Sequence, residues 1–162
     1  MSIFDRLSEK KGPLTTKADA IGSIRKYFDD IEYKYDYIEK DSAIITGFMG
    51  DDLPIRIGIY IGEETIVFRS VLDLCAQKNN YPQVLEELNR INASLVFGMF
   101  FLDTEDGFII FEYGFPYNDA RLSPDFFLGF LRMIIKTVDD HDGDLKKIAE
   151  ERSADEYWSM YR

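Results

Sequence analysis

The spacing of the apolar residues changes at residue 31, and no other feature of the sequence constrains the fold more. Before this point they recur at intervals of three or four, as on one face of a helix: Ile21, Ile24, Phe28 and Ile31. After it they alternate with charged residues, as in a half-buried strand: Ile31, Tyr33, Tyr35 and Tyr37. Thr15 or Thr16 is a suitable N-cap for the helix, with Asp19 in its first turn. The chain therefore begins with a helix that leads into strands.

Three more strand-like runs follow, at 42–49, 53–61 and 65–72. The central run has the clearest alternation, with an apolar residue at every second position from Leu53 to Ile61. Short turn signals separate the runs, Gly50-Asp51-Asp52 and Gly62-Glu63-Glu64. Four strands joined by short turns predict an antiparallel meander.

The second half of the chain adds helices and a hairpin. A helix is predicted from Asn80 to Ile91, with Asn80 as its cap, and two strands follow at 95–102 and 108–113. A long last helix begins after Ser123, and its apolar face continues to Ala149 beyond an expected interruption at Asp142-Gly143. The sequence thus predicts an α+β fold: helix, four-stranded antiparallel meander, helix, two-stranded hairpin and long C-terminal helix.

The net charge limits the kinds of partner. The 162 residues include 19 basic and 30 acidic side chains, for a net charge of −11. Seven of these eleven charges fall in residues 103–162, which hold 7 basic and 14 acidic side chains. Such acidity argues against nucleic acid and against anionic membrane surfaces, both of which are bound through Lys and Arg. It permits a basic or amphipathic protein partner.

The length and the cysteine content predict one domain in a reducing compartment. Cys75 is the single cysteine, so no intramolecular disulfide forms. The N-terminus lacks the apolar stretch of a signal peptide, and the longest apolar run, 95–102, is too short to span a bilayer. We expect a cytoplasmic protein with a flexible lead-in at 1–14, one α+β domain at 15–152 and an aromatic tail at 153–162.

Several short segments resemble a known family. They are Leu88-Asn89-Arg90-Ile91-Asn92, Gly98-Met99-Phe100-Phe101-Leu102-Asp103, the hairpin from Gly107 to Pro116, and Leu122-Ser123-Pro124 before the long helix. In these, and in element order over residues 17–150, the chain resembles the YbjN-type bacterial domain, which shares its fold with type III secretion chaperones of the CesT kind. The resemblance implies a small, acidic, usually dimeric domain that binds or regulates other proteins without catalysis. It offers no catalytic residues, and the tail from Ser153 to Arg162 departs from the family pattern.

An acidic cluster at 139–144 is the strongest candidate for ion chemistry. Asp140, Asp142, Asp144 and Glu151 occupy positions 1, 3, 5 and 12 of an EF-hand-like count. Position 6, which needs glycine for a sharp turn, is Leu145. We therefore expect no metal site, although a calcium-binding protein or a carboxylate-dependent enzyme centred on these residues stays an alternative.

No other cluster indicates catalysis or a cofactor. His141 is the only histidine, and a buried thiol is the simplest interpretation of Cys75, so a Cys–His nucleophile has little support. Zinc sites usually need four Cys or His ligands, and the glycines follow no nucleotide-binding spacing. We expect no catalytic residue and no cofactor.

Two aromatic groups are the candidate partner-binding residues: Tyr33, Tyr35 and Tyr37 on the early strand, and Tyr157, Trp158 and Tyr161 in the tail. Tyrosine and tryptophan are enriched at protein interfaces. The early row is equally consistent with an ordinary sheet face. The tail could dock on its own domain, on a second subunit or on a partner.

Together these features predict a non-enzymatic chaperone-like or regulatory protein-binding module, forming a homodimer. Its partner segment would lie in a groove or add a strand to a sheet edge. An acidic immunity-type protein that neutralises a basic toxin is the alternative within the same binding class.

Overall fold

The computed structural model describes residues 15–117 and 122–160. The expected lead-in at 1–14 and Tyr161 lie outside these residues. The described helices are α2 (Lys17–Asp30), α3 (Tyr81–Asn92), α4 (Pro124–Leu145) and α5 (Asp155–Ser159). The strands are β1 (Asp36–Ile38), β2 (Ala43–Met49), β3 (Pro54–Ile61), β4 (Thr65–Cys75), β5 (Met99–Leu102), β6 (Phe108–Pro116) and β7 (Glu150–Glu151).

One antiparallel sheet organises the described part of the chain. Its strand order is β1-β2-β3-β4-β6-β5, and β7 pairs with β4 through Leu74 and Glu151. The first four strands form the predicted meander, and the predicted hairpin β5–β6 is added beside β4. The α+β class and the order of its main elements are confirmed.

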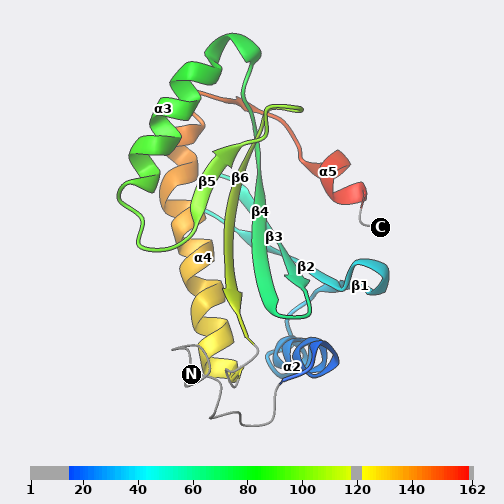
Figure 1. Ribbon diagram of the computed structural model, residues 1–162. Coiled ribbons are helices and arrows are strands. Elements are labelled where there is room, and N and C mark those ends of the chain that lie inside the picture. Colours follow the sequence, from blue (N-terminus) through cyan, green and yellow to red (C-terminus); the bar gives the residue numbers. More distant parts are fainter. Residues whose placement is uncertain (1–14, 118–121, 161–162) are drawn as a thin grey trace, which may run out of the picture.

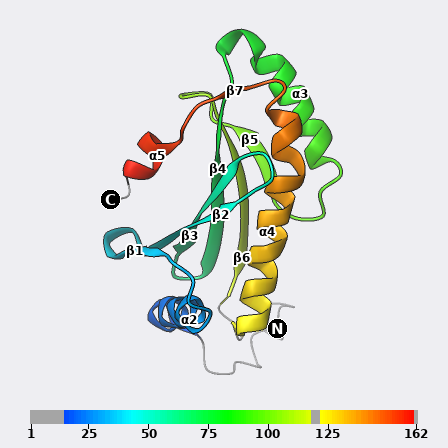
Figure 2. The same cartoon turned by 180° about the vertical axis from the view of Figure 1, so that it is seen from behind.

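The helices α2, α3 and α4 cover one face of the sheet, and α5 lies on the other face (Figures 1 and 2). The alternating isoleucines of β3, from Ile55 to Ile61, are buried on the helix-covered face. Helix α4 supplies Phe127, Leu131, Ile134 and Val138 to the same core, as its apolar stripe predicts. A second, smaller cluster on the opposite face contains Val71, Phe108, Ile110, Ala154, Tyr157 and Trp158.

Of the two predicted N-caps, Thr15 or Thr16 for α2 and Asn80 for α3, only the first is present. The Thr16 hydroxyl accepts from the Asp19 N–H, and the Asp19 carboxylate accepts from the Thr16 N–H, which is a complete capping box. Ser123 caps α4 through the Phe126 N–H. Asn80 does not cap α3: its Oδ1 accepts no hydrogen bond from the described residues, and its Nδ2 donates to the Ile148 carbonyl at 2.7 Å.

Two predicted strands are shorter than expected. The early strand is only β1, and Tyr33 and Tyr35 precede it, because Glu32 adopts a left-handed conformation (φ 52°) and the Tyr33 N–H donates to Phe28 O of the helix end. The expected strand at 95–102 begins only at Met99, after Gly98 with φ 69°.

The expected interruption at Asp142-Gly143 is wrong, because α4 continues to Leu145. A glycine inside a helix costs only about 1 kcal/mol. Here its missing side chain also makes room for Asp52, whose Oδ2 would lie 2.5 Å from a Cβ at this position. The buried positions Val138, Asp142 and Leu145 keep the helical spacing through the glycine.

Beyond Leu145, the strand β7 and the helix α5 were not expected from the sequence. Among the described helices, none is long and apolar enough to cross a bilayer.

Candidate partner-binding site

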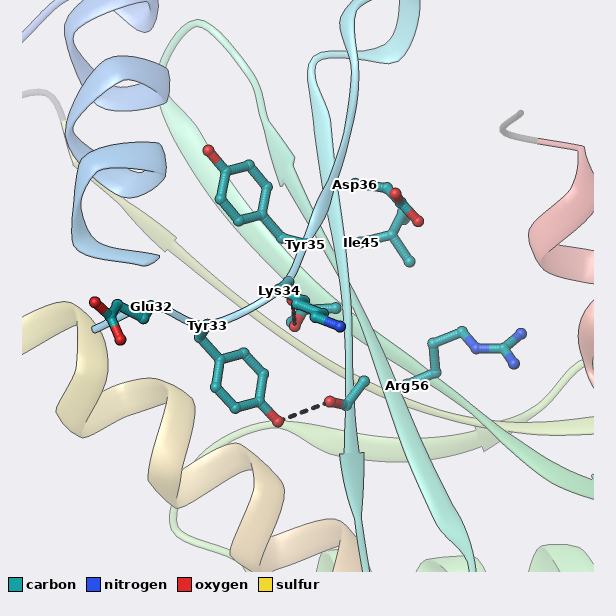
Figure 3. Close-up of a pocket in the computed structure, with 9 residues that line it drawn as sticks. Glu32, Tyr33, Lys34, Tyr35, Asp36, Ile45 and Arg56 are labelled. Carbon is teal, nitrogen blue, oxygen red and sulfur yellow. Dashed lines mark hydrogen bonds between the residues drawn. The ribbon is translucent and has the colours of Figure 1, made fainter. Parts of the chain in front are cut away.

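A pocket of about 570 Å³ lies where the chain passes from α2 into β1. Residues 32–36 form one wall, and Ile45, Thr46 and Gly47 of β2 with Arg56 of β3 form the other (Figure 3). The lining includes two tyrosines and side chains of both charge signs, Glu32, Lys34, Asp36 and Arg56. The predicted residues Tyr33 and Tyr35 are therefore part of a concave surface, and Tyr37 lies outside its lining.

The pocket borders an open edge of β2. The short strand β1 pairs with β2 only from Asp36↔Ile45 to Ile38↔Ala43. In the described residues, positions 46–49 have β3 as their strand partner on one side and no strand on the other. Side chain and loop contacts replace the missing strand: the Tyr33 hydroxyl donates to Gly47 O at 2.9 Å, and the Thr46 hydroxyl donates to Lys34 O at 2.9 Å. Gly47 O therefore points toward this edge.

The three early tyrosines do not share one surface. Tyr33 is exposed and stacks on Phe48, with ring centroids 5.0 Å apart. Tyr35 is half-buried beside Phe28 at 5.4 Å, and its hydroxyl donates to the Asp29 carboxylate. Tyr37 is half-buried, with the Arg25 guanidinium 4.7 Å from its ring centre.

Each of these tyrosines therefore helps to attach the segment before β2 to the rest of the domain. Tyr33 is the one with a ring exposed enough for a large contact with a partner.

A second exposed apolar surface lies over α4 and β6. Tyr113 stacks on Phe130 with a centroid distance of 5.5 Å, and Phe126 packs edge-on against Phe130 at 4.7 Å. Phe126 is 42% exposed, and Met133 on the same helix is equally exposed. Phe126 and Phe130 belong to the apolar stripe of this helix. The width of that stripe, two adjacent residues at each turn, was the only signal that part of it reaches the surface.

The tail residues Tyr157 and Trp158 lie in α5, on the sheet face opposite α4 (Figure 2), and Arg56 of the pocket lining pairs with Asp155 of the same helix. Tyr157 is 8% exposed and Trp158 is 3% exposed, in the cluster with Val71 and Phe108. Both rings are thus engaged by their own chain in this structure.

The acidic cluster does not converge on one point. Asp140 pairs with Lys136 at 2.7 Å, Asp144 with Lys147 at 2.6 Å, and Glu151 with Lys146 at 2.8 Å. The side chains of Asp140 and Asp144 are half exposed to solvent, whereas Asp142 is fully buried. Within 15–117 and 122–160, no three His, Cys, Asp or Glu side chains are arranged to hold a metal ion. Cys75 is buried at the end of β4, as expected.

Asp142 has an unusual environment for a carboxylate. Neither of its oxygens has a hydrogen-bond partner among the described residues. Burial, and then the neighbouring carboxylates of Asp139 and Asp52, raise its pKa to about 6, while the Gly143 backbone N–H and then Lys146 act in the opposite direction. This arrangement disfavours the charged form of the Asp142 carboxyl.

Comparison with known proteins identifies the family. A model of the YbjN family, described as "putative bacterial sensory transduction regulator", matches residues 21–147. The chain belongs to the YbjN family. Among curated proteins, no significant sequence match was found.

Solved structures agree with this assignment. The crystal structure of YbjN from E. coli, described as a "putative transcription regulator", matches with a TM-score of 0.63 and 16% identity, over 80% of this chain and 94% of that one. A chain of the heterodimeric ExoU–SpcU complex of the Pseudomonas aeruginosa type III secretion system matches with a TM-score of 0.52 and 12% identity. The match covers 78% of this chain and 98% of that one. At these identities the likeness shows a shared fold, the chaperone-like α+β fold. The β7–α5 segment lies beyond the residues that the family model matches.

Proposed function

We propose that this YbjN-family chain is a non-catalytic protein-binding module, chaperone-like or regulatory, that acts in the bacterial cytoplasm. Its partner would contribute an extended segment that adds a strand to the open edge of β2. The carrying observation is that, within residues 15–117 and 122–160, no second strand pairs with positions 46–49 on the side away from β3, where the tyrosine-lined pocket lies.

The local chemistry suits strand addition. A partner strand would offer a backbone N–H to Gly47 O in place of the Tyr33 hydroxyl, so the exchange conserves a hydrogen bond. Met49, 90% exposed at the end of the same edge, would provide an apolar contact for the incoming segment. Main-chain hydrogen bonds would supply affinity, and the pocket would select a side chain of the partner.

We also propose that the module is a homodimer in solution, as the resemblance to its family implies. The exposed aromatic surface of α4 and β6 is not used by the β2-edge site, and a second copy would bury it. Light scattering after gel filtration tests this. A mass of twice that of the chain is expected, and a mass of one chain at high concentration would contradict the dimer.

The partner proposal is tested by affinity capture with three versions of the tagged full chain. Wild type and Val96→Lys are expected to recover the same stoichiometric partner from the native lysate. Met49→Lys is expected to lose it, because a charge at a strand edge opposes the addition of another strand. Val96 is a matched control, since it is 97% exposed and lies away from the β2 edge, so both substitutions add the same charge without affecting the core.

The identity of the captured protein then separates a chaperone or regulator from an acidic immunity-type protein. Recovery of the partner by Met49→Lys at the wild-type level would refute binding at the β2 edge. Failure of every version to recover a partner would argue against the binding role itself.

A further inference from the structure

The sheet face opposite α2, α3 and α4 carries only α5 among the described helices (Figure 2). The segment from Glu150 to Ser159 approaches this face as β7, pairs with β4, and then crosses toward β3 as α5. This segment lies outside the range of the family match, which ends at residue 147. It is thus an addition that lies on the sheet of the family fold.

The sheet has a seat for the indole ring. Gly58 of β3 leaves space there, because a Cβ at that position would lie 3.0 Å from Trp158 Cζ3 and 2.9 Å from the Tyr60 ring. Val71 of β4 and Ile110 of β6 complete the apolar floor. This small cluster is separate from the main core, on the other side of the sheet.

Polar groups around the seat recognise specific positions of the segment. The Arg56 guanidinium pairs with the Asp155 carboxylate at 2.9 Å. Arg69 Nη1 donates to the Tyr157 hydroxyl at 3.0 Å, and Glu112 holds Arg69 through a 2.6 Å ion pair.

The start of the segment is recognised through its backbone. The Asp73 carboxylate accepts from the Ala154 N–H at 2.8 Å, one residue before α5 begins. Together these contacts form a peptide-recognition site. It pairs with the backbone of the segment, binds one carboxylate and one hydroxyl of its side chains, and accommodates its indole ring.

We infer that this sheet face is a second protein-interaction surface, specific for a short acidic–aromatic peptide, and that the chain's own residues 150–159 are its resident occupant. The partner chemistry is an acidic residue followed two and three positions later by tyrosine and tryptophan, as in Asp155, Tyr157 and Trp158. Arg56 supplies the positive charge for the acidic position of such a peptide, and Arg69, held by Glu112, supplies the donor for its tyrosine hydroxyl.

The resident segment is suited to exchange. A helix of five residues is far too short to be stable alone, so it stays in place only through its contacts with the sheet. As a tethered occupant it has an effective concentration on the order of millimolar, so a free peptide competes well only when the tail is weakened. Arg56 also lines the β2-edge pocket, but peptide binding is measured through Trp158 and Arg69, so its outcome does not depend on the β2-edge proposal.

The test uses the fact that Trp158 is the single tryptophan of the chain. The full chain with Trp158→Ala contains no tryptophan, so a synthetic peptide of residues 150–160 supplies the only indole signal. We expect saturable binding with a blue shift of the peptide emission. A dye-labelled version of the peptide is expected to bind wild type at least tenfold more weakly, because its site is occupied.

Two control chains define the site. Adding Arg69→Ala to Trp158→Ala is expected to weaken binding at least tenfold, since the tyrosine and carboxylate partners of Arg69 lose their donor. Adding Arg132→Ala, a matched change at an exposed position of α4, is expected to leave binding unchanged. A peptide with alanine at both aromatic positions is expected not to bind.

A second variant covers the case in which Trp158→Ala does not fold. Asp155→Ala removes an exposed ion-pair partner of Arg56 and leaves the aromatic cluster in place. It is expected to bind the labelled peptide about threefold better than wild type, as the loss of one such ion pair implies. Equal binding by wild type and Asp155→Ala, absence of binding to folded Trp158→Ala, or insensitivity to Arg69→Ala would each overturn the inference.

Discussion

Replacing Asp142 by asparagine should stabilise the protein at neutral pH. The carboxylate is fully buried in α4, close to the carboxylates of Asp139 and Asp52. Its two oxygens have no hydrogen-bond partner in the described structure. Asparagine keeps the shape of the protonated acid and removes the charge, so it should relieve the cost of burying an unpaired anion.

The pKa of Asp142 sets the size and the sign of the effect. Burial raises this pKa from 3.8 to about 6 in the folded chain. Above pH 6 the carboxyl is ionised in both the folded and the unfolded states. Folding then has to bury a charged group, and this lowers the stability of the folded state. At about 1.36 kcal/mol per pKa unit, the difference between 3.8 and about 6 corresponds to about 3 kcal/mol of lost stability. The loss shrinks as the pH falls from 6 toward 3.8, and it vanishes below 3.8, where both states are protonated.

Urea unfolding of wild type and Asp142→Asn at pH 8, 6 and 4.5 measures the difference. We expect the variant to gain about 2 to 3 kcal/mol at pH 8, with a steadily smaller gain at lower pH. Asp140→Asn is the matched control. Asp140 is a partly exposed partner of Lys136, so its loss should cost no more than about 0.5 kcal/mol. A gain for Asp142→Asn that is absent at pH 8, or that does not change with pH, would refute the reasoning.

Three further substitutions test the local structure. Thr16→Ala removes the capping box of α2 and should cost about 0.5 to 2 kcal/mol, measured by thermal unfolding; an unchanged midpoint would argue against the cap. Gly58→Val should displace the indole, so that Trp158 emission shifts to the red while far-UV circular dichroism stays unchanged; an unshifted spectrum would place the ring elsewhere. Gly98→Ala places a side chain at a left-handed position (φ 69°), with its Cβ in collision with the Phe111 ring. It should lower the free energy of unfolding by at least about 1 kcal/mol in urea. An unchanged free energy of unfolding would contradict the backbone conformation that precedes β5.

Elements were predictable where one residue spacing extended over their whole length. The alternation in β3 and the stripe of α4 identified both elements and their buried faces. Local signals were misleading where a single tertiary contact outweighed them. Glycine at 143 indicated a break, but the approach of Asp52 uses that glycine inside a continuous helix.

The candidate site was predicted only in part. Tyrosine in alternating positions indicated an interface, and Tyr33 and Tyr35 do line the pocket beside β2. Nothing in the spacing revealed that pairing with β2 stops at Asp36 and leaves an edge open. Strand length at an edge depends on where the preceding helix ends in space, and that position is a property of the packed domain.

Local periodicity, capping residues and turn residues by themselves determined the α+β class, the order of the main elements and the inward face of each one, because those signals act over a few neighbouring residues. Only the tertiary structure decided that Gly58 of β3 makes room for Trp158, and that Arg69 of β4 binds the Tyr157 hydroxyl 88 residues later in the chain. The same holds for Asp142, whose high pKa arises from burial and from Asp52 on a distant turn. Burial and charge proximity across such separations are set by how the elements pack, so they have no signature in the order of the residues.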